Sequence, residues 1–140
     1  MITDQVAFVL DSAVTMAWFF PNEATKEAAA NLARLRLSGA AVPSLWPLEV
    51  ANVMLIGEKR GRVTQNDTEA FVTLLRGLPI SVEEETPRYA WGEILRLARL
   101  HKLTPYDASY LELALRLGLP LATLDKELRQ AALDSGVPLL

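Results

Sequence analysis

The chain has 140 residues, of which 51% are hydrophobic, a formal net charge of −3, one histidine and no cysteine. This length fits a single domain over residues 1–140 with its own core, and the residue content excludes a disulfide framework, a structural zinc site and a cysteine nucleophile. The apolar runs fall well short of the ~20 residues that span a bilayer, and no basic stretch precedes the first of them. We therefore expect a soluble, cytoplasmic protein that does not bind membranes.

Five short apolar runs alternate with longer helix-like stretches along the chain. After the first run, each of the others follows a glycine that can end a helix in the left-handed conformation. The candidate strands are residues 6–10, 40–42, 79–82, 120–123 and 137–139. Alternating strands and helices favour a parallel sheet covered on both faces. The sequence therefore predicts a three-layer α/β/α sandwich with a short five-stranded, mainly parallel sheet.

The helix-like stretches differ in length and in their end signals. A short helical turn is expected over residues 13–20, where Pro21 stops it. Three of the longer stretches begin with a threonine cap signal. The longer helices are predicted over residues 24–38, 45–59, 64–76, 87–100, 105–117 and 125–135.

Four carboxylates are expected at one edge of this sheet. Asp11 and Asp125 each close an apolar run, whereas Glu49 and Asp107 stand near the beginnings of two helices. A helix that feeds a strand from its amino end starts at the opposite edge, which places Asp107 at the carboxyl edge of the strands. Ligands of open parallel sheets bind at this edge.

Convergence of these carboxylates would create a site for a cation. Unit charges of one sign ~4 Å apart repel by roughly 4 kcal/mol at an effective dielectric near 20, so such a cluster requires a cation or protonation. Oxygen ligands favour magnesium or manganese over zinc. Removing the four from the 17 acidic residues leaves 13 against 14 basic residues, so the remaining surface is compatible with nucleic acid.

Three of the four carboxylates also have an ordinary structural explanation. Thr104 begins a capping pattern in which Asp107 could serve backbone N–H groups, and Asp11 and Asp125 could each cap a helix. The segment that ends in Asp67 has the same pattern but follows no strand, so we interpret Asp67 as a cap only.

Glu49 has the weakest structural explanation, because apolar residues flank it on its helix. Asn52, three residues later, shares its face and could orient the carboxylate or contact a substrate. Lys126 and Arg129 are candidates for contacts with a nucleic-acid backbone. The run of three glutamates at residues 83–85 is expected to be solvated.

Four segments resemble the PIN-domain ribonucleases, and most closely the VapC-type toxins of toxin–antitoxin pairs. They are residues 8–14 (FVLDSAV), 47–53 (PLEVANV), 103–110 (LTPYDASY) and 122–125 (ATLD). The resemblance implies that Asp11, Glu49, Asp107 and Asp125 are the metal-binding acidic residues. It also matches Ser12 and Thr123 to hydroxyl residues beside the first and last aspartates, and places Glu127 where some relatives carry a further acidic residue.

The expected function is a metal-dependent endoribonuclease that hydrolyses RNA phosphodiester bonds with Mg²⁺ or Mn²⁺. Asp11, Asp107 and Asp125 are expected to bind the metal directly or through water, and Glu49 to bind it or to orient the attacking water. The resemblance further implies a type II toxin, a cognate antitoxin and a homodimer.

Two alternatives from other classes remain open. One is a noncatalytic PIN-like interaction module. The other is a phosphohydrolase of the haloacid dehalogenase type, although Ala13 occupies the position where that chemistry typically uses a second aspartate.

Overall fold

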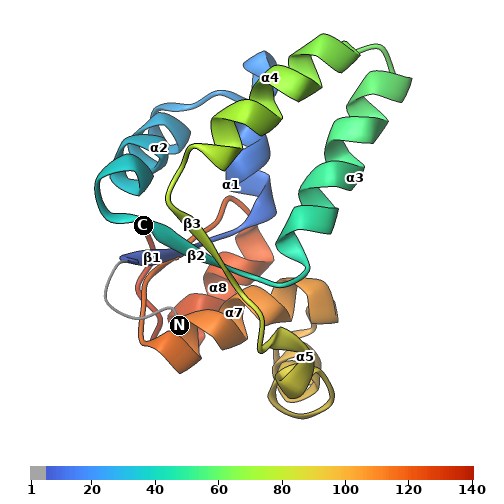
Figure 1. Ribbon diagram of the computed structural model, residues 1–140. Coiled ribbons are helices and arrows are strands. Elements are labelled where there is room, and N and C mark those ends of the chain that lie inside the picture. Colours follow the sequence, from blue (N-terminus) through green and yellow to red (C-terminus); the bar gives the residue numbers. More distant parts are fainter. Residues whose placement is uncertain (1–5) are drawn as a thin grey trace.

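Residues 6–140 are described by a computed structural model, in which four short strands form one parallel sheet (Figure 1). The sheet has the order β3-β2-β1-β4, and all three of its pairings are parallel. The strands are β1 (Phe8–Leu10), β2 (Ala40–Pro43), β3 (Ile80–Glu83) and β4 (Leu121–Ala122). The predicted α/β class is confirmed.

The predicted fifth strand, residues 137–139, is not formed as a strand. Leu139 makes a single parallel bridge to Leu121 at the outer side of β4. The segment is three residues long and contains Pro138, which has no backbone N–H to donate to a sheet. The sheet therefore has four strands, with one bridge where the fifth was expected.

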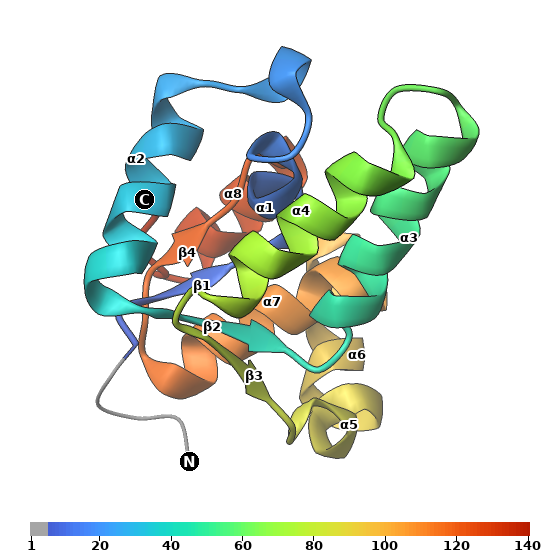
Figure 2. The same ribbon diagram turned by 45° about the horizontal axis from the view of Figure 1, so that its top comes forward.

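Helices cover both faces of the sheet (Figures 1 and 2). On one side lie the helices that connect β1, β2 and β3, and on the other side lie those that follow β3. The first group is α1 (Ser12–Ala17), α2 (Lys26–Ser38), α3 (Trp46–Lys59) and α4 (Gln65–Arg76), with a 3₁₀ turn at Pro21–Glu23. The second group is α5 (Thr86–Tyr89), α6 (Leu95–His101), α7 (Pro105–Leu117) and α8 (Lys126–Asp134).

The helix expected over residues 87–100 is present as a continuous helical run. A π-helical turn at Ala90–Ile94 lies inside it, between α5 and α6. Gly92 lies inside this turn and has the weakest helix propensity of any residue except proline. Trp91, beside it, is 93% exposed.

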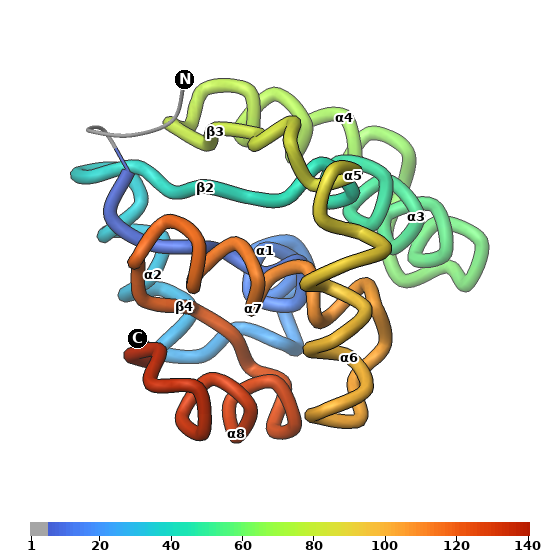
Figure 3. Tube along the Cα trace, turned by 90° about the horizontal axis from the view of Figure 1, so that it is seen from below, coloured from blue at the N-terminus to red at the C-terminus, as the bar shows by residue number. Residues whose placement is uncertain are grey.

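The core is built around β1 and α7. Every side chain of β1 is fully buried, as expected for a parallel strand covered on both faces. Helix α7 packs against β1 and β2 on the face of the sheet that Figure 3 shows from below. Its side chains Tyr110, Leu111 and Leu113 are buried. Because β1 and β4 are parallel neighbours, the residues that follow them meet at the same edge of the sheet.

No helix in residues 6–140 is long and apolar enough to cross a membrane.

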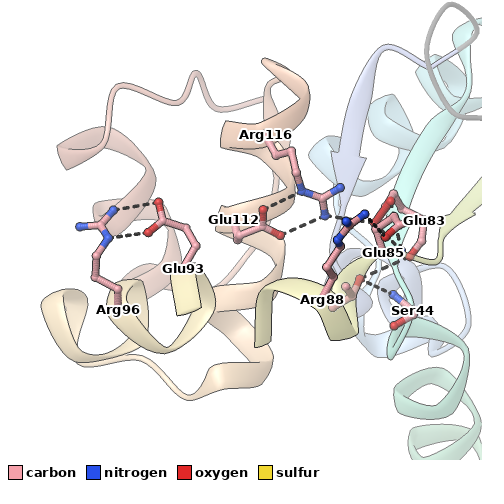
Figure 4. Close-up of polar contacts among 9 residues, drawn as sticks. Ser44, Glu83, Glu85, Arg88, Glu93, Arg96, Glu112 and Arg116 are labelled. Carbon is pink, nitrogen blue, oxygen red and sulfur yellow. Dashed lines mark hydrogen bonds and ion pairs between the residues drawn. The ribbon is translucent and has the colours of Figure 1, made fainter. Parts of the chain in front are cut away.

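The charge run at residues 83–85 differs from expectation at its first member. Glu83 is only 8% exposed, and the guanidinium of Arg116 donates to its carboxylate at 3.0 Å (Figure 4). Arg116 also donates two hydrogen bonds to the buried Glu112, and its guanidinium lies 4.1 Å from the centre of the Tyr89 ring. The prediction of a solvated run was wrong for Glu83, because its ion-pair partner lies 33 residues away in α7.

Candidate metal centre

Asp11 joins the end of β1 to the beginning of α1. Its backbone N–H donates to the carbonyl of Ala122 in β4 at 3.2 Å, which fixes the residue against the sheet. Its Oδ1 accepts from the N–H of Val14 at 2.8 Å, so Asp11 is the N-cap of α1. The side chain is nevertheless almost completely buried, with 4% of the residue exposed.

Thr123 connects Asp11 to Asp125. Its hydroxyl oxygen accepts from the N–H of Asp125 at 3.1 Å, and its side chain lies close enough to Asp11 to lower the pKa of that carboxylate. Asp125 in turn caps α8, because its Oδ1 accepts from the N–H of Leu128 at 2.9 Å. Arg129 donates to the carbonyl of Thr123 at 3.0 Å. The strand ends of β1 and β4 are thereby held together by side chains as well as by the sheet.

Asp107 stands in the first turn of α7 and is half-buried. The hydroxyl of Thr104 accepts from its N–H at 3.1 Å, which is one half of a capping box. In α4 both halves are present, since Asp67 also accepts from the N–H of Thr64 at 2.9 Å. Among residues 6–140 no such reciprocal bond is formed by Asp107. Asp67 is confirmed as a cap, whereas capping leaves the carboxylate of Asp107 unexplained.

Glu49 lies in the first turn of α3 and is partly buried. Its Oε1 accepts a hydrogen bond from the hydroxyl of Tyr110 in α7, and the side chain of Ser12 lies beside that hydroxyl. Asn52 is exposed and, within the described residues, makes no hydrogen bond to Glu49. The sequence interpretation missed Tyr110, although its position three residues after Asp107 places both on neighbouring parts of one helix face.

The carboxylates influence one another electrostatically. Burial, together with the smaller effect of the charges of Asp107 and Asp125, raises the pKa of Asp11 to about 7, against the lowering effect of its hydrogen bonds. Burial also raises the pKa of Asp107, to which the charges of Asp125 and Glu127 add. The pKa of Glu49 is raised by burial and by the charge of Asp107. Asp107 thus interacts with each of the other three predicted site residues.

The donor set fits a divalent cation in its chemistry. All four predicted ligands are carboxylates, and within residues 6–140 none of them forms an ion pair with lysine or arginine. Oxygen donors that carry uncompensated negative charge suit magnesium or manganese. As the side chains stand, no three His, Cys, Asp or Glu residues of this part of the chain are close enough together to hold one ion. The assignment of individual ligands therefore stays a prediction.

Comparison with known proteins identifies a family. A family model described as "PIN domain" matches residues 8–133. The structure of PAE2754 from Pyrobaculum aerophilum is similar, with a TM-score of 0.68 and 24% identity over 91% of this chain and 85% of that chain. FitAcB from Neisseria gonorrhoeae has a TM-score of 0.63 and 17% identity over 95% of this chain and 96% of that chain. These two likenesses show the shared fold. A comparison with curated proteins found no significant match.

Proposed function

The chain belongs to the PIN domain family, and on this basis we propose that it is a metal-dependent endoribonuclease that hydrolyses phosphodiester bonds in RNA. PIN domains are generally nucleases and generally use divalent metal ions. The observation that carries the proposal is the buried carboxylate of Asp11. It lies within the field of Asp107 and Asp125, its pKa is raised to about 7, and no lysine or arginine of the described residues neutralises it.

In the proposed site, Asp11, Asp107 and Asp125 hold Mg²⁺ or Mn²⁺ directly or through water, after side-chain movements that bring the carboxylates together. When bound, the ion supplies activation of water near neutral pH and charge stabilisation of the transition state. Glu49 binds the ion or orients the attacking water. Thr123 holds the backbone of Asp125 through its hydroxyl and lies beside the carboxylate of Asp11.

Neighbouring polar residues suit contacts with the RNA backbone. Arg129 is held beside the end of β4 by its bond to the carbonyl of Thr123, and Lys126 is exposed in the first turn of α8. Both cations can reach a phosphate without giving up an ion pair of the described residues. Asn52, exposed on α3, is a further candidate for a substrate contact.

We further propose that the protein is the VapC-type toxin of a type II toxin–antitoxin pair, acting in the cytoplasm as a homodimer and held inactive by a cognate antitoxin. The proposal takes residues 1–140 as one PIN-like domain. Exposed apolar side chains on α3, Leu48 and Leu55, and an apolar groove of about 390 Å³ between α3, α4 and β3 support protein partners. Light scattering on the purified protein distinguishes a dimer from a monomer.

A noncatalytic PIN-like interaction module is the second candidate. It is favoured by the absence, within residues 6–140, of three acidic or histidine side chains close enough as they stand to hold an ion. Membership of the PIN domain family removes the support for a haloacid dehalogenase-type phosphohydrolase.

Cleavage of mixed RNA substrates by wild type and by Asp107→Asn, with and without Mg²⁺ or Mn²⁺, tests the proposal. We expect metal-dependent cleavage that falls by about 100-fold or more in the variant, because a site of this kind contributes several kcal/mol to the transition state. Asp67→Asn is the matched control, since it makes the same change in the same sequence pattern at a residue that only caps α4. It should cleave like wild type.

Equal cleavage by wild type and Asp107→Asn would contradict the proposed site. Binding of Mn²⁺ without cleavage of any RNA, in protein free of antitoxin, would favour the interaction module.

A further inference from the structure

Tyr110 connects the two helical layers at the carboxyl edge of the sheet. It belongs to α7, whereas its hydrogen-bond acceptor Glu49 belongs to α3 on the other side of the sheet, 61 residues away in sequence. Tyr110 is 1% exposed and is among the largest fully buried side chains in the described residues. Its position therefore leaves its hydroxyl little freedom to find another partner.

The bonding at this hydroxyl is directional. A phenol has one O–H to donate, and Tyr110 donates it to Oε1 of Glu49, while the Ser12 side chain lies beside the same hydroxyl. A tyrosine phenol ordinarily has a pKa of about 10, so it is a neutral hydrogen-bond donor near neutral pH. A buried hydroxyl that loses its acceptor is unfavourable, which opposes rotation of Glu49 away from Tyr110.

We propose that Tyr110 is a positioning residue, which fixes one carboxylate oxygen of Glu49 so that only the other faces the metal or the attacking water. This inference rests on the proposed function. It assigns Glu49 a restricted role: with Oε1 held by Tyr110, Oε2 is the oxygen that is turned toward the ion or the attacking water. Ser12, which contacts the same hydroxyl, supports Tyr110 from α1.

A purely structural role is the competing explanation, in which Glu49 merely satisfies a buried hydroxyl. The two differ in what removal of the hydroxyl does to metal binding. A structural role predicts lower stability with unchanged affinity for Mn²⁺. A positioning role predicts weaker binding of Mn²⁺, and it predicts that this loss disappears when Glu49 is already absent.

The test is the dissociation constant of Mn²⁺, measured by titration calorimetry on wild type, Tyr110→Phe, Glu49→Ala and the double variant. Removal of a group that orients a metal ligand typically costs 10–100-fold in affinity, so we expect Tyr110→Phe to bind Mn²⁺ at least about 10-fold more weakly. The double variant should bind no more weakly than Glu49→Ala alone. Tyr89→Phe is the matched control, because the Tyr89 ring packs under Arg116, and it should bind like wild type.

Two results would overturn the inference while leaving the proposed function intact. One is that Tyr110→Phe binds Mn²⁺ as tightly as wild type. The other is that the double variant loses Mn²⁺ affinity by the product of the losses in the two single variants. Failure of wild type itself to bind Mn²⁺ would overturn the proposed function and this inference with it. In a cleavage assay the positioning role predicts that Tyr110→Phe has a lower kcat with little change in KM for RNA. If Tyr110→Phe instead loses its fold, its thermal midpoint should fall below that of Tyr89→Phe, and both cleavage and Mn²⁺ binding should be lost.

Discussion

Asp11 does two things that have opposite effects on its carboxylate. As the N-cap of α1 it accepts a backbone N–H, which favours the charged form, but burial at the end of β1 favours the neutral form. Burial has the larger effect, and the neighbouring charges of Asp107 and Asp125 act in the same direction. A helix cap needs none of this burial, as the exposed cap of α4 demonstrates.

The raised pKa of Asp11 predicts a pH dependence of stability in the metal-free protein. The unfolded chain releases this proton near the ordinary value of 3.8 and the folded chain near about 7, so between these values the folded state binds more protons. The free energy of unfolding therefore falls as pH rises through this window, by up to ~1.4 kcal/mol per pH unit. Asp11→Asn, which can still cap α1, should remove this contribution and be the more stable protein at neutral pH.

Urea unfolding of wild type and Asp11→Asn between about pH 4 and pH 7, without metal, measures this difference. The same pH slope in both proteins would contradict a buried, charge-repelled Asp11. At neutral pH, saturating Mg²⁺ should make wild type more stable than Asp11→Asn, because the ion stabilises wild type only.

Single residues differed in how far the sequence could predict them. Asp67 and Asp107 occupy the same local pattern, and only the strand positions separated the cap from the candidate ligand. Tyr110 and Glu83 could not be assigned, because their partners lie 61 and 33 residues away and no local pattern encodes such pairs. The carboxylates that follow strands could be predicted from the sequence, because the hydrophobic pattern indicates where each strand ends.

Among the elements, helices with clear end signals were predicted best. Helix α7 begins at Pro105 after its Thr104 cap and ends at Leu117 before Gly118, as expected. The helix expected over residues 87–100 is also present, with a π-helical turn inside it that the apolar pattern does not reveal. The fifth strand was wrong, because Pro138 lacks an N–H for the sheet and only Leu139 makes a bridge.

The link between β3 and α7 depends on Arg116, whose guanidinium bonds to Glu83 and Glu112 (Figure 4). Arg116→Ala leaves two buried carboxylates without a cation, and we expect a loss of about 3 kcal/mol in the free energy of unfolding. Arg96→Ala is the control, because Arg96 forms an exposed pair with Glu93 within one helical segment and should change stability little. Chemical denaturation of the three proteins measures both effects, and equal stabilities for the two variants would contradict a structural role for the network.

At the scale of the whole molecule, the topology explains why residues from four elements meet. Right-handed crossovers send α1 to α4 to one face of the sheet and α5 to α8 to the other, while every strand points the same way. The beginnings of α1, α3, α7 and α8 consequently surround the carboxyl edge. This convergence could be predicted from the order of elements in the sequence. The distances between the side chains, on which the coordination of an ion depends, could not be predicted in this way.

Anomalous diffraction from crystals grown with Mn²⁺ shows whether this edge binds a divalent cation through the predicted carboxylates. We expect an anomalous peak at the carboxyl edge, with the ion bound by Asp11, Asp107 and Asp125 directly or through water and with Oε1 of Glu49 still bonded to Tyr110. No peak at this edge at a saturating concentration of Mn²⁺, or an Asp107 carboxylate turned away from Asp11, would contradict it.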